Sequence, residues 1–558
     1  MTTTVIVGGV AGGMSTAARL RRRDENTDII VYEASENVSF ANCGLPYYVG
    51  GIIPERDSLL LQTPAALKAR LNLDVFVSHR VTSIDRDAKT VTVKNLTTGE
   101  EKTQGYDFLV LSPGATPFMP PIPGIDRALT LRTVEDVDRI AEAVAKQSPQ
   151  SAAIIGGGFI GLELAENLHH RGIKTTIVER APQILAPLDE EMAGIVMKHL
   201  RDAGIEVILN ADTKNITDSV MEVELLDRDN NKVGDATVDA ELLVAAIGVR
   251  PESSLAKDAG LAVGERGGIK VDRQQRTSDP AVFALGDAAE KVDAISGEDT
   301  MVPLAQTANR HGRMVADIIT GRDEEAQLTL GTAIVGVLGM AAGSVGWNER
   351  RARQAGKNVR CVHIHPGNHA GYYPGSETVH LKLVVDADTD AILGAQGVGG
   401  EGVDKRIDVI ATAMRAGLKA SDLQNLELAY APQFGSAKDP INFLGFVNDN
   451  AVNGENLVQW HELEDFMADE NNVVIDVSTA EEYAEHGIDG TILAPVDELR
   501  EWIAAGNLEP LKGKNLLLIC WSGVRSHVAA TAFRPYGFQP SNLAGGIMTY
   551  EFGQYARA

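Results

Sequence analysis

Two of the three cysteines stand in sequence contexts that suit thiol chemistry. Cys43 lies in residues 39–48 (SFANCGLPYY), ten residues after the apolar run 29–33, which ends in an acid. Cys520 opens the loop 520–526 (CWSGVRS), which follows another apolar run. A thiolate at either place would be a nucleophile toward disulfides or sulfane sulfur. The sequence therefore predicts two separate sulfur centres.

The cysteine count also limits the setting and the chemistry. No second cysteine lies within a few residues of Cys43, so no internal dithiol can form there. Cys361, in a strand-like stretch, is interpreted as a packed core cysteine. Three cysteines do not make a disulfide scaffold, and the N-terminus has no basic region typical of a signal peptide. We expect a reducing, cytoplasmic setting.

Length and charge exclude several classes of function. The 558 residues suggest three to four domains at about 150 residues each. A net charge of -26 argues against a general nucleic-acid or membrane-surface binder. The uncharged run 326–348 is long enough to span a membrane, but its five glycines and its strand formers favour a buried strand pair. No metal site is predicted.

Residues 4–33 predict a strand, a glycine turn, a helix and a second strand. Gly8 and Gly13 bound the turn, and Glu33 ends the second strand. Such a unit binds a dinucleotide, because the glycines let the backbone approach a pyrophosphate and the acid accepts from a ribose. Val10 interrupts the strict G-x-G-x-x-G pattern, and a purely structural turn is the alternative.

A second unit of the same kind begins at about residue 152 and keeps the full pattern. Its turn glycines are Gly156, Gly158 and Gly161, and Glu179 ends the following strand. Glu179 would accept from the 2′-OH of NADH and repel a 2′-phosphate. Arg180 beside it leaves NADPH possible, since an arginine pairs with that phosphate.

Two dinucleotide units in one chain indicate a flavin enzyme, with one unit for FAD and the other for the nicotinamide. The run 243–251 ends in a Gly/Pro-containing turn, and the run 282–287 ends at Asp287. An aspartate at that place can accept from a flavin ribityl hydroxyl, whereas a turn aspartate is the alternative interpretation.

The C-terminal segment has its own alternating strands and helices. Strands are expected at 473–477 and 516–519, and a helix at 527–533. The loop between the last two places Cys520 near a helix N-terminus and beside Arg525, and both features stabilise a thiolate or persulfide anion. A structural cysteine is the alternative.

These motifs together resemble a known family. Residues 1–447 resemble the single-cysteine pyridine nucleotide–disulfide oxidoreductases, residues 39–48 look like the signature of coenzyme A-disulfide reductases, and residues 457–558 resemble a rhodanese domain. The combination is similar to the coenzyme A-disulfide reductase–rhodanese fusions, some of which are NADH-dependent persulfide reductases. The implied fold class is α/β.

The implied architecture has two Rossmann-like dinucleotide-binding domains, an α+β dimerisation domain and a C-terminal α/β rhodanese domain. The expected boundaries are 1–120 with 250–328 for FAD, 121–249 for NAD(P)H, 329–447 for dimerisation, 448–456 for a linker and 457–558 for rhodanese.

The resemblance also implies a homodimer and a coenzyme A site. Tyr373 and Tyr430 match two tyrosines that reach toward the partner subunit's cysteine. The residues that match coenzyme A contacts are Ser39, Asn42, His369 and Lys438. Arg19 and Arg22 are candidates for its phosphates, with a solvated helix face as the alternative.

Two departures from related patterns matter. Flavin peroxidases and water-forming oxidases of this fold have a histidine in the first glycine turn, where this chain has Ala11, which argues against peroxide chemistry. The usual Asp-Val-Arg near the start of a rhodanese domain is Asp-Val-Ser at 476–478, which predicts looser domain packing.

The predicted reaction carries electrons from NADH through FAD to a mixed disulfide of Cys43 with coenzyme A. Tyr373 and Tyr430 would supply a proton to the leaving thiolate, and Cys520 would carry sulfur from small donors as a persulfide. The substrate is then a coenzyme A persulfide or polysulfide. One alternative is a coenzyme A-disulfide reductase with an accessory rhodanese domain. Another is a sulfurtransferase whose flavoprotein half only senses redox state.

Overall fold

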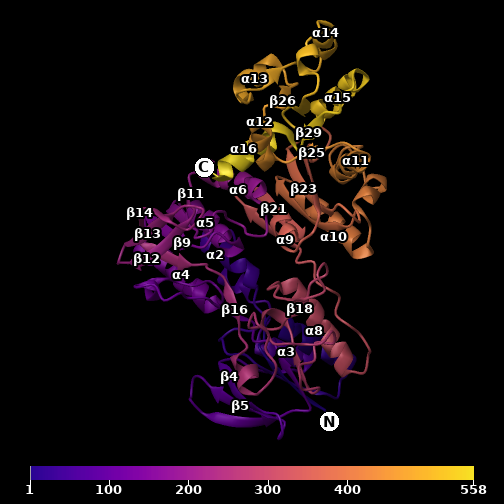
Figure 1. Ribbon diagram of the computed structural model, residues 1–558. Coiled ribbons are helices and arrows are strands. Elements are labelled where there is room, and N and C mark those ends of the chain that lie inside the picture. The colour runs from indigo at the N-terminus through magenta and orange to yellow at the C-terminus, as the bar shows by residue number, and fades with distance from the viewer. Residues whose placement is uncertain (1, 558) are drawn as a thin grey trace. The chain divides into compact units, whose positions relative to one another are not determined.

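The computed structural model describes residues 2–557, which form two compact units. The first unit comprises the chain up to Ala181 together with Gly204–Gly331, and the second comprises Pro182–Ala203 together with the chain from Thr332 onward. Figure 1 labels their helices and strands. Among the described residues, no helix is long and apolar enough to cross a membrane.

The first unit is built on a five-stranded parallel sheet in the order β17-β7-β1-β2-β3. Side chains alternate across β1, so Val5 and Val7 join the core on one face and Ile6 joins the core on the other. Helix α1 packs closely on α8. These elements are β1 (Thr3–Val7), α1 (Ala11–Arg23), β2 (Asp28–Tyr32), β3 (Asp74–Phe76), β7 (Phe108–Leu111), β17 (Val282–Ala284) and α8 (Ala305–Ile319).

A second parallel sheet in this unit has the order β11-β10-β9-β15. Its elements are β9 (Ser151–Ile155), α5 (Phe159–His170), β10 (Lys174–Val178), β11 (Glu206–Ile208) and β15 (Leu242–Ala245). Both predicted strand–turn–helix–strand units are therefore present. In each, the acid lies one residue beyond the second strand rather than inside it.

Smaller elements complete the first unit. Two three-stranded antiparallel sheets and two two-stranded pairs flank the parallel sheets. The strands are β4 (His79–Asp85), β5 (Thr90–Asn95), β6 (Glu101–Gly105), β8 (Ala115–Pro117), β12 (Ala211–Ile216), β13 (Val220–Leu226), β14 (Lys232–Asp239), β16 (Val249–Pro251), β18 (Lys291–Val292) and β19 (Asp299–Thr300). The helices are α2 (Leu45–Gly50), α3 (Pro64–Leu71), α4 (Val134–Gln147) and α7 (Ser254–Asp258).

The second unit contains a five-stranded antiparallel sheet in the order β20-β21-β24-β23-β22. Its elements are α6 (Glu190–Asp202), β20 (Ala333–Val337), β21 (Met340–Gly346), α9 (Glu349–Gln354), β22 (Val359–Ile364), β23 (Val379–Asp386), β24 (Ile392–Gly399), α10 (Val403–Ala416) and α11 (Pro440–Val452). The run 326–348 thus contains a strand pair, as predicted. Helix α10 covers the face that carries Leu381, and α6 packs near the opposite face.

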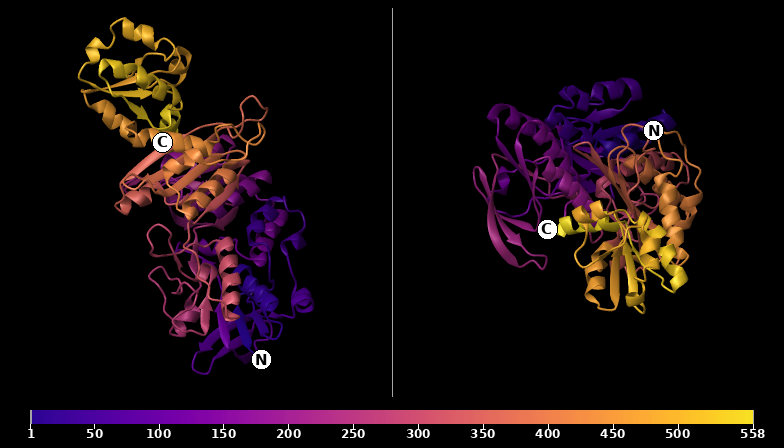
Figure 2. Two further views of the ribbon diagram at one scale, coloured as in Figure 1. Left: turned by 90° about the vertical axis from the view of Figure 1, so that its right-hand side faces the viewer. Right: turned by 90° about the horizontal axis from the view of Figure 1, so that it is seen from above.

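The C-terminal part of this unit is a parallel sheet in the order β25-β29-β28-β26-β27, flanked by helices in both views of Figure 2. Its elements are β25 (Leu457–Val458), α12 (Leu463–Ala468), β26 (Asn472–Asp476), α13 (Ala480–His486), β27 (Ile492–Leu493), α14 (Leu499–Ala504), β28 (Asn515–Ile519), α15 (Val524–Phe533), β29 (Ser541–Leu543) and α16 (Gly546–Arg557).

Two local features differ from expectation. Helix α15 begins at Val524, three residues earlier than predicted, because Gly523 takes a left-handed conformation (φ +84°) that turns the chain directly into the helix. Helix α11 extends to Val452, so the expected linker 448–456 begins inside a helix. The domain boundaries given above otherwise remain predictions.

Candidate active site

Cys43 is exposed in a short 3₁₀ turn, Asn42–Gly44, that leads into α2. The preceding segment is held by its backbone. The amide of Ser39 donates to the carbonyl of Gly9 (2.8 Å), and that of Ala41 donates to Leu59 (2.8 Å). These bonds connect the cysteine segment to the first glycine turn, so Cys43 lies close to the predicted nucleotide site.

The electrostatic surroundings of Cys43 are acidic. Partial burial, followed by the nearby carboxylates of Glu163 and Asp287, raises the pKa of the Cys43 thiol. Glu163 lies on α5 and accepts a hydrogen bond from the Tyr47 hydroxyl (3.2 Å). Burial and Glu163 together raise the pKa of Tyr47 to about 12. The short α2 helix therefore does not by itself favour a thiolate at Cys43.

The first glycine turn fits a dinucleotide. Gly8 has φ +96°, and a Cβ there would lie 2.0 Å from the Ser112 carbonyl oxygen. A Cβ at Gly13 would lie 1.9 Å from the carbonyl oxygen of Gly8. Glu33 accepts from the amide of Gly9 (2.6 Å), which holds its carboxylate against the turn. The pyrophosphate and ribose of FAD would lie along these groups.

The three glycines of the second turn are required for different structural reasons. Gly156 needs its left-handed backbone (φ +111°), and Gly161 packs tightly on the turn, with its Cβ position 2.0 Å from the carbonyl oxygen of Gly156. A Cβ at Gly158 meets no described atom within 4 Å, which is the open approach that a pyrophosphate requires. Glu179 accepts from the amides of Gly157 (2.7 Å) and Ala181 (2.7 Å).

Asp287 lies in a 3₁₀ turn, Gly286–Ala288, at the end of β17. The buried Lys291 ammonium holds this turn, since it donates to the carbonyls of Gly286 and Ala289. Burial lowers the pKa of Lys291 to about 8, opposed by Asp287. The predicted ribityl-binding aspartate is thus positioned by a lysine that no sequence motif indicated.

The first-unit candidates for coenzyme A differ in how available they are. Arg19 makes two hydrogen bonds to the buried Asp317 (2.9 and 3.0 Å), so its guanidinium already has a partner inside the protein. Arg22 and Asn42 are exposed, and Ser39 is half-buried with φ +51°. The phosphate role remains a prediction, and Arg22 fits it better than Arg19.

Two loops of the second unit carry the remaining coenzyme A candidates. Tyr373 and Tyr430 are both exposed, at 43% and 50%, as is Lys438, whereas His369 is buried and stacks edge-on against Tyr373. The Tyr430 hydroxyl lies 3.2 Å from that of Tyr372. Tyr373 and Tyr430 are therefore accessible to a ligand or another chain, and the Tyr430 hydroxyl already has Tyr372 as a neighbour.

A buried arginine braces these two loops. Arg406 on α10, 1% exposed, donates to the carbonyl of Asn368 (2.7 Å) in one loop and to the carboxylate of Asp439 (3.2 Å) after the other. Backbone bonds from the Ala370 amide to Pro432 and Gly435 join the loops directly. Sequence reasoning missed Arg406, because one arginine on an amphipathic helix gives no distinctive signal.

Cys520 lies at the carboxyl end of β28 and is fully buried. Its carbonyl accepts from the amide of Ile547 (2.9 Å), which joins the loop to the start of α16. Arg525 pairs with Glu482 through two bonds of 2.6 and 2.9 Å, and this bond lowers the pKa of Glu482 to about 2. The loop thus has its predicted cation, already balanced by an acid.

The departure at 476–478 leaves polar atoms without partners. Asp476 and Ser478 are both buried, and Asp476 accepts from the Ser478 amide (2.9 Å). Its other oxygen and the Ser478 hydroxyl make no hydrogen bond within residues 2–557. The segment is closed to solvent at Ser478, although its polar groups are incompletely paired.

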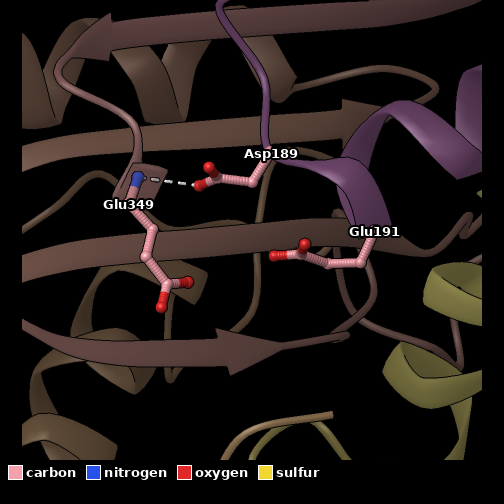
Figure 3. A group of neighbouring side chains, drawn as sticks. All are labelled: Asp189, Glu191 and Glu349. Atoms are coloured by element: carbon pink, nitrogen blue, oxygen red, sulfur yellow. Dashed lines mark hydrogen bonds between the residues drawn. The ribbon is translucent and has the colours of Figure 1, made fainter. Parts of the chain in front are cut away.

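Three buried carboxylates elsewhere in the second unit have the spacing of a metal site (Figure 3). They belong to Asp189, Glu191 and Glu349, and the Lys382 ammonium lies within 2.9, 2.5 and 2.8 Å of them. Burial opposes a charge on Lys382, but the carboxylates of Asp189 and Glu191 raise its pKa well above the usual value. The lysine supplies the positive charge that a metal would otherwise bring.

Comparison with known proteins now decides the family. The family described as pyridine nucleotide-disulphide oxidoreductase matches residues 2–312, and its dimerisation domain matches residues 332–439. The chain belongs to this family. A rhodanese-like domain matches residues 459–551. Membership of the pyridine nucleotide-disulphide oxidoreductases implies FAD and a nicotinamide cofactor, and the two glycine turns fit them.

Curated relatives within the family are coenzyme A disulfide reductases. The Staphylococcus haemolyticus protein is 32% identical over 443 residues, which is 79% of this chain and 98% of that protein. The Staphylococcus aureus (strain JH9) protein is 34% identical over the same shares. The recognition of this family from the cysteine segment is confirmed.

Solved structures resemble the whole chain, including its C-terminal part. Reduced Bacillus anthracis CoADR-RHD has a TM-score of 0.93 and 43% identity, covering 100% of this chain and 98% of that one. A NAD-dependent persulfide reductase from A. fulgidus has a TM-score of 0.89 and 36% identity, covering 98% and 100%. The predicted four-part α/β architecture is confirmed.

Proposed function

We propose that the protein uses NADH to reduce coenzyme A persulfide, polysulfide or related sulfane sulfur, releasing hydrosulfide. The observation that carries this proposal is that one chain contains an exposed cysteine and a buried cysteine in two different domains. Cys43 is exposed beside the predicted flavin site, and Cys520 is enclosed in a rhodanese loop. Covalent fusion raises the local concentration of carried sulfur near the reductase half.

The proposed step at Cys43 is an exchange between sulfur atoms. The Cys43 thiolate attacks the inner sulfur of coenzyme A persulfide, the sulfur–sulfur bond breaks, and the outer sulfur leaves as hydrosulfide. The product is a mixed disulfide of Cys43 and coenzyme A. Two electrons and a proton then return it to the Cys43 thiolate and free coenzyme A thiol. When bound, FAD and the nicotinamide supply these two electrons.

The acidic surroundings of Cys43 bear on this step. Partial burial, followed by Glu163 and Asp287, raises the pKa of the thiol, so these surroundings oppose formation of the thiolate. Tyr373 and Tyr430 are the candidates for donating a proton to the leaving thiolate, as members of a homodimer in which each subunit's tyrosines serve its partner. His369, Lys438, Ser39 and Asn42 are proposed contacts of coenzyme A.

Cys520 is proposed to carry sulfur between a small donor and coenzyme A. Its thiolate takes the outer sulfur atom from the donor as a persulfide, while the rest of the donor leaves with the electron pair of the broken bond. Coenzyme A thiolate then removes that sulfur, which regenerates the Cys520 thiolate. Arg525 belongs to the loop that receives this charge.

NADH is the proposed nicotinamide rather than NADPH. Glu179 is fixed at the ribose position by two backbone amides, and its charge would repel a 2′-phosphate. Arg180 is not available to offset this repulsion as freely as the sequence suggested, since it lies 3.4 Å from Asp212. An Asp212→Asn variant is expected to improve kcat/KM for NADPH several-fold. If the ratio of kcat/KM for NADPH to kcat/KM for NADH does not change, the Arg180–Asp212 ion pair does not control selectivity.

A second function is supported by the curated relatives, whose names describe coenzyme A disulfide reductases. In this alternative the same mixed disulfide forms at Cys43, coenzyme A thiolate leaves in place of hydrosulfide, and the rhodanese domain is accessory. The dimerisation domain and both glycine turns suit this reaction equally.

A panel of substrates separates these functions. NADH oxidation is measured with coenzyme A persulfide and with coenzyme A disulfide, and both assays are repeated with NADPH. Faster turnover of the persulfide supports the proposal, whereas faster turnover of the disulfide supports the alternative. NADH-linked turnover of neither would leave a sulfurtransferase with a redox-sensing flavoprotein half.

A Cys520→Ser variant tests the carrier role. We expect it to retain turnover of free coenzyme A persulfide and to lose turnover that begins from a separate sulfur donor. If the variant keeps full activity with every donor, Cys520 is not the carrier.

A further inference from the structure

Among the described residues, the Cys520 side chain interacts with both Arg525 and Ser526, and the Ser526 contact begins a buried hydrogen-bond chain. The Sγ atom lies 3.4 Å from the Ser526 hydroxyl oxygen. The Ser526 hydroxyl donates to Oδ1 of Asn542 (2.7 Å). Ser526 is completely buried, and Asn542 on β29 is 6% exposed. What holds Asn542 therefore determines where the Ser526 proton points.

The Asn542 amide has only one workable orientation. Its Nδ2 donates to Oε1 of Glu455 (3.1 Å) and to the carbonyl of Gly523 (3.1 Å). Both partners are acceptors, so the nitrogen must face them and Oδ1 must face Ser526. The hydroxyl proton of Ser526 is then committed to Asn542, which leaves an oxygen lone pair toward Cys520. In the thiol form, Cys520 is the donor in that contact.

Glu455 joins the Cys520–Ser526–Asn542 hydrogen-bond chain from outside the parallel sheet. It lies between α11 and β25, in the segment expected to be a linker. Its side chain is nevertheless only 6% exposed, and its second oxygen lies 2.7 Å from Nδ1 of His527. That bond to Glu455 raises the pKa of His527. The connecting segment thus contributes a buried charge to the rhodanese site.

We propose that Glu455 is a positioning residue for Cys520, acting through Asn542 and Ser526. By directing the Ser526 proton away from the sulfur, it withholds a hydrogen bond that would stabilise the thiolate. A less stabilised thiolate is the stronger nucleophile, since thiolate reactivity falls as the thiol becomes more acidic. The role rests on the proposed sulfur-carrier function, because it sets the balance between the amount of Cys520 thiolate and its nucleophilicity toward a donor.

The other charged groups around the loop act from other directions. Arg525, the second residue of α15, pairs with Glu482 on α13 and also interacts with Cys520, and Asp476 ends β26. Arg534 also influences His527. None of these groups hydrogen-bonds Asn542 among the described residues, so the Glu455 branch can be tested separately.

The test measures alkylation of Cys520 against pH in a full-length Cys43→Ser background. In Asn542→Ala, we expect the pH of half-maximal alkylation to fall by about one unit, because Ser526 can turn its proton to the sulfur. In Glu455→Ala the fall should be smaller but measurable, because the Gly523 carbonyl still holds the Asn542 amide. The limiting rate at high pH should fall about threefold. The double variant should change no further than Asn542→Ala, because Glu455 acts only through Asn542.

Two further variants distinguish positioning from charge and from damage to the fold. Glu455→Gln removes the charge but keeps an acceptor for Asn542, so it should retain the wild-type limiting rate. Glu509→Ala removes an exposed acid that pairs with Lys512 and should behave as wild type. Unchanged profiles in Glu455→Ala, additive effects in the double variant, or equal effects of Glu455→Gln and Glu455→Ala would each overturn the proposal.

Failure of the carrier function itself would look different. Mass spectrometry of the wild-type chain after exposure to thiosulfate or an organic persulfide reports whether Cys520 takes up sulfur. If it does not, the carrier function fails whatever the alkylation profiles show. If it does, and Glu455→Ala loads at the wild-type rate, this inference alone fails.

Discussion

Cys43 is exposed at the start of a six-residue helix, whereas Cys520 is fully buried at the end of a strand. The carboxylates near Cys43 disfavour its thiolate, while the loop of Cys520 contains Arg525 and leads into the ten-residue helix α15. The two cysteines therefore differ both in burial and in the charges around them: Cys43 has carboxylates nearby, and Cys520 has a guanidinium that interacts with it.

The sharpest way to test this contrast is to remove Cys43. In Cys43→Ser, NADH-linked turnover of coenzyme A disulfide and persulfide should fall on the order of a thousandfold or more, because a hydroxyl cannot form the mixed disulfide. Sulfur uptake by Cys520 should be unaffected. Loss of both activities together would mean that the two centres are not independent; steady-state NADH oxidation and mass spectrometry provide the two measurements.

A pair of histidines in the second unit lies against α16. Nδ1 of His365 lies 2.8 Å from Nδ1 of His380, and Nε2 of His365 lies 2.8 Å from the Thr549 hydroxyl. Burial lowers the pKa of His380 to about 4 and that of His365 well below its usual value. Both rings are therefore uncharged at neutral pH.

This pair predicts acid sensitivity of the second unit. Because the folded-state pKa is lowered, the stability contribution of His380 is complete above pH 6.5 and is lost as pH falls toward 4. The free energy of unfolding should drop by about 3 kcal/mol over that window. Urea unfolding at pH 7 and pH 4.5 measures this drop, and His380→Asn should reduce it. The exposed His170 provides a control, since His170→Asn should leave it unchanged.

A smaller effect is expected from Glu163, the carboxylate that contributes most to the raised pKa of Cys43. Glu163→Gln removes a charge that raises the pKa of Cys43, so half-maximal alkylation of that thiol should move to lower pH by about one unit. Below the midpoint the rate should rise by up to about tenfold. Glu166 raises the pKa of Glu163, and the charges that directly raise that of Cys43 are Glu163 and Asp287, so Glu166→Gln should shift the profile much less than Glu163→Gln. An equal shift in both variants would contradict a specific role for Glu163.

The smallest expected effect concerns the ion pair beside Cys520. Bonding to Arg525 lowers the pKa of Glu482 to about 2, so its stabilisation is present above about pH 4.3 and is lost as pH falls toward 2. The Glu482 side chain is 37% exposed, and solvent screening limits the contribution to about 1 kcal/mol or less. In Glu482→Gln, the free energy of unfolding should fall less steeply as pH decreases from about 4.3 toward 2 than in the wild type. Unfolding followed by circular dichroism at several pH values measures this slope. An unchanged decline would assign no stability to the pair.

Much of the fold could be predicted from local sequence patterns. The glycine turns, their strands and the acids after them follow from short-range backbone requirements, as at Gly156 and Glu179. The cysteine segment identified the family, and the strand–loop–helix around Cys520 indicated the C-terminal domain. Motifs of this kind can be recognised in a sequence because residues close together in the chain determine their geometry.

The residues that could not be predicted carry no motif of their own. Lys291 supports the neighbouring Asp287 turn from β18, whereas Arg406 joins two loops and Glu455 enters the rhodanese site from a segment expected to be a linker, both across long separations. Each is a single polar residue whose partner is set by tertiary packing. The roles of the candidate coenzyme A residues remain predictions for the same reason.

The buried Lys382 limits where the chain can be cut to obtain its C-terminal half as a separate piece. Its carboxylate partners Asp189 and Glu191 come from Pro182–Ala203, a piece of chain that lies in the sequence between the two segments of the first unit. Helix α6 also lies against α16, where Gly194 approaches Phe552. A gene fragment that begins at Thr332 would leave an ammonium group in apolar surroundings with two of its three counter-charges missing. Swapping the C-terminal half between proteins as a cassette therefore requires that α6 travel with it.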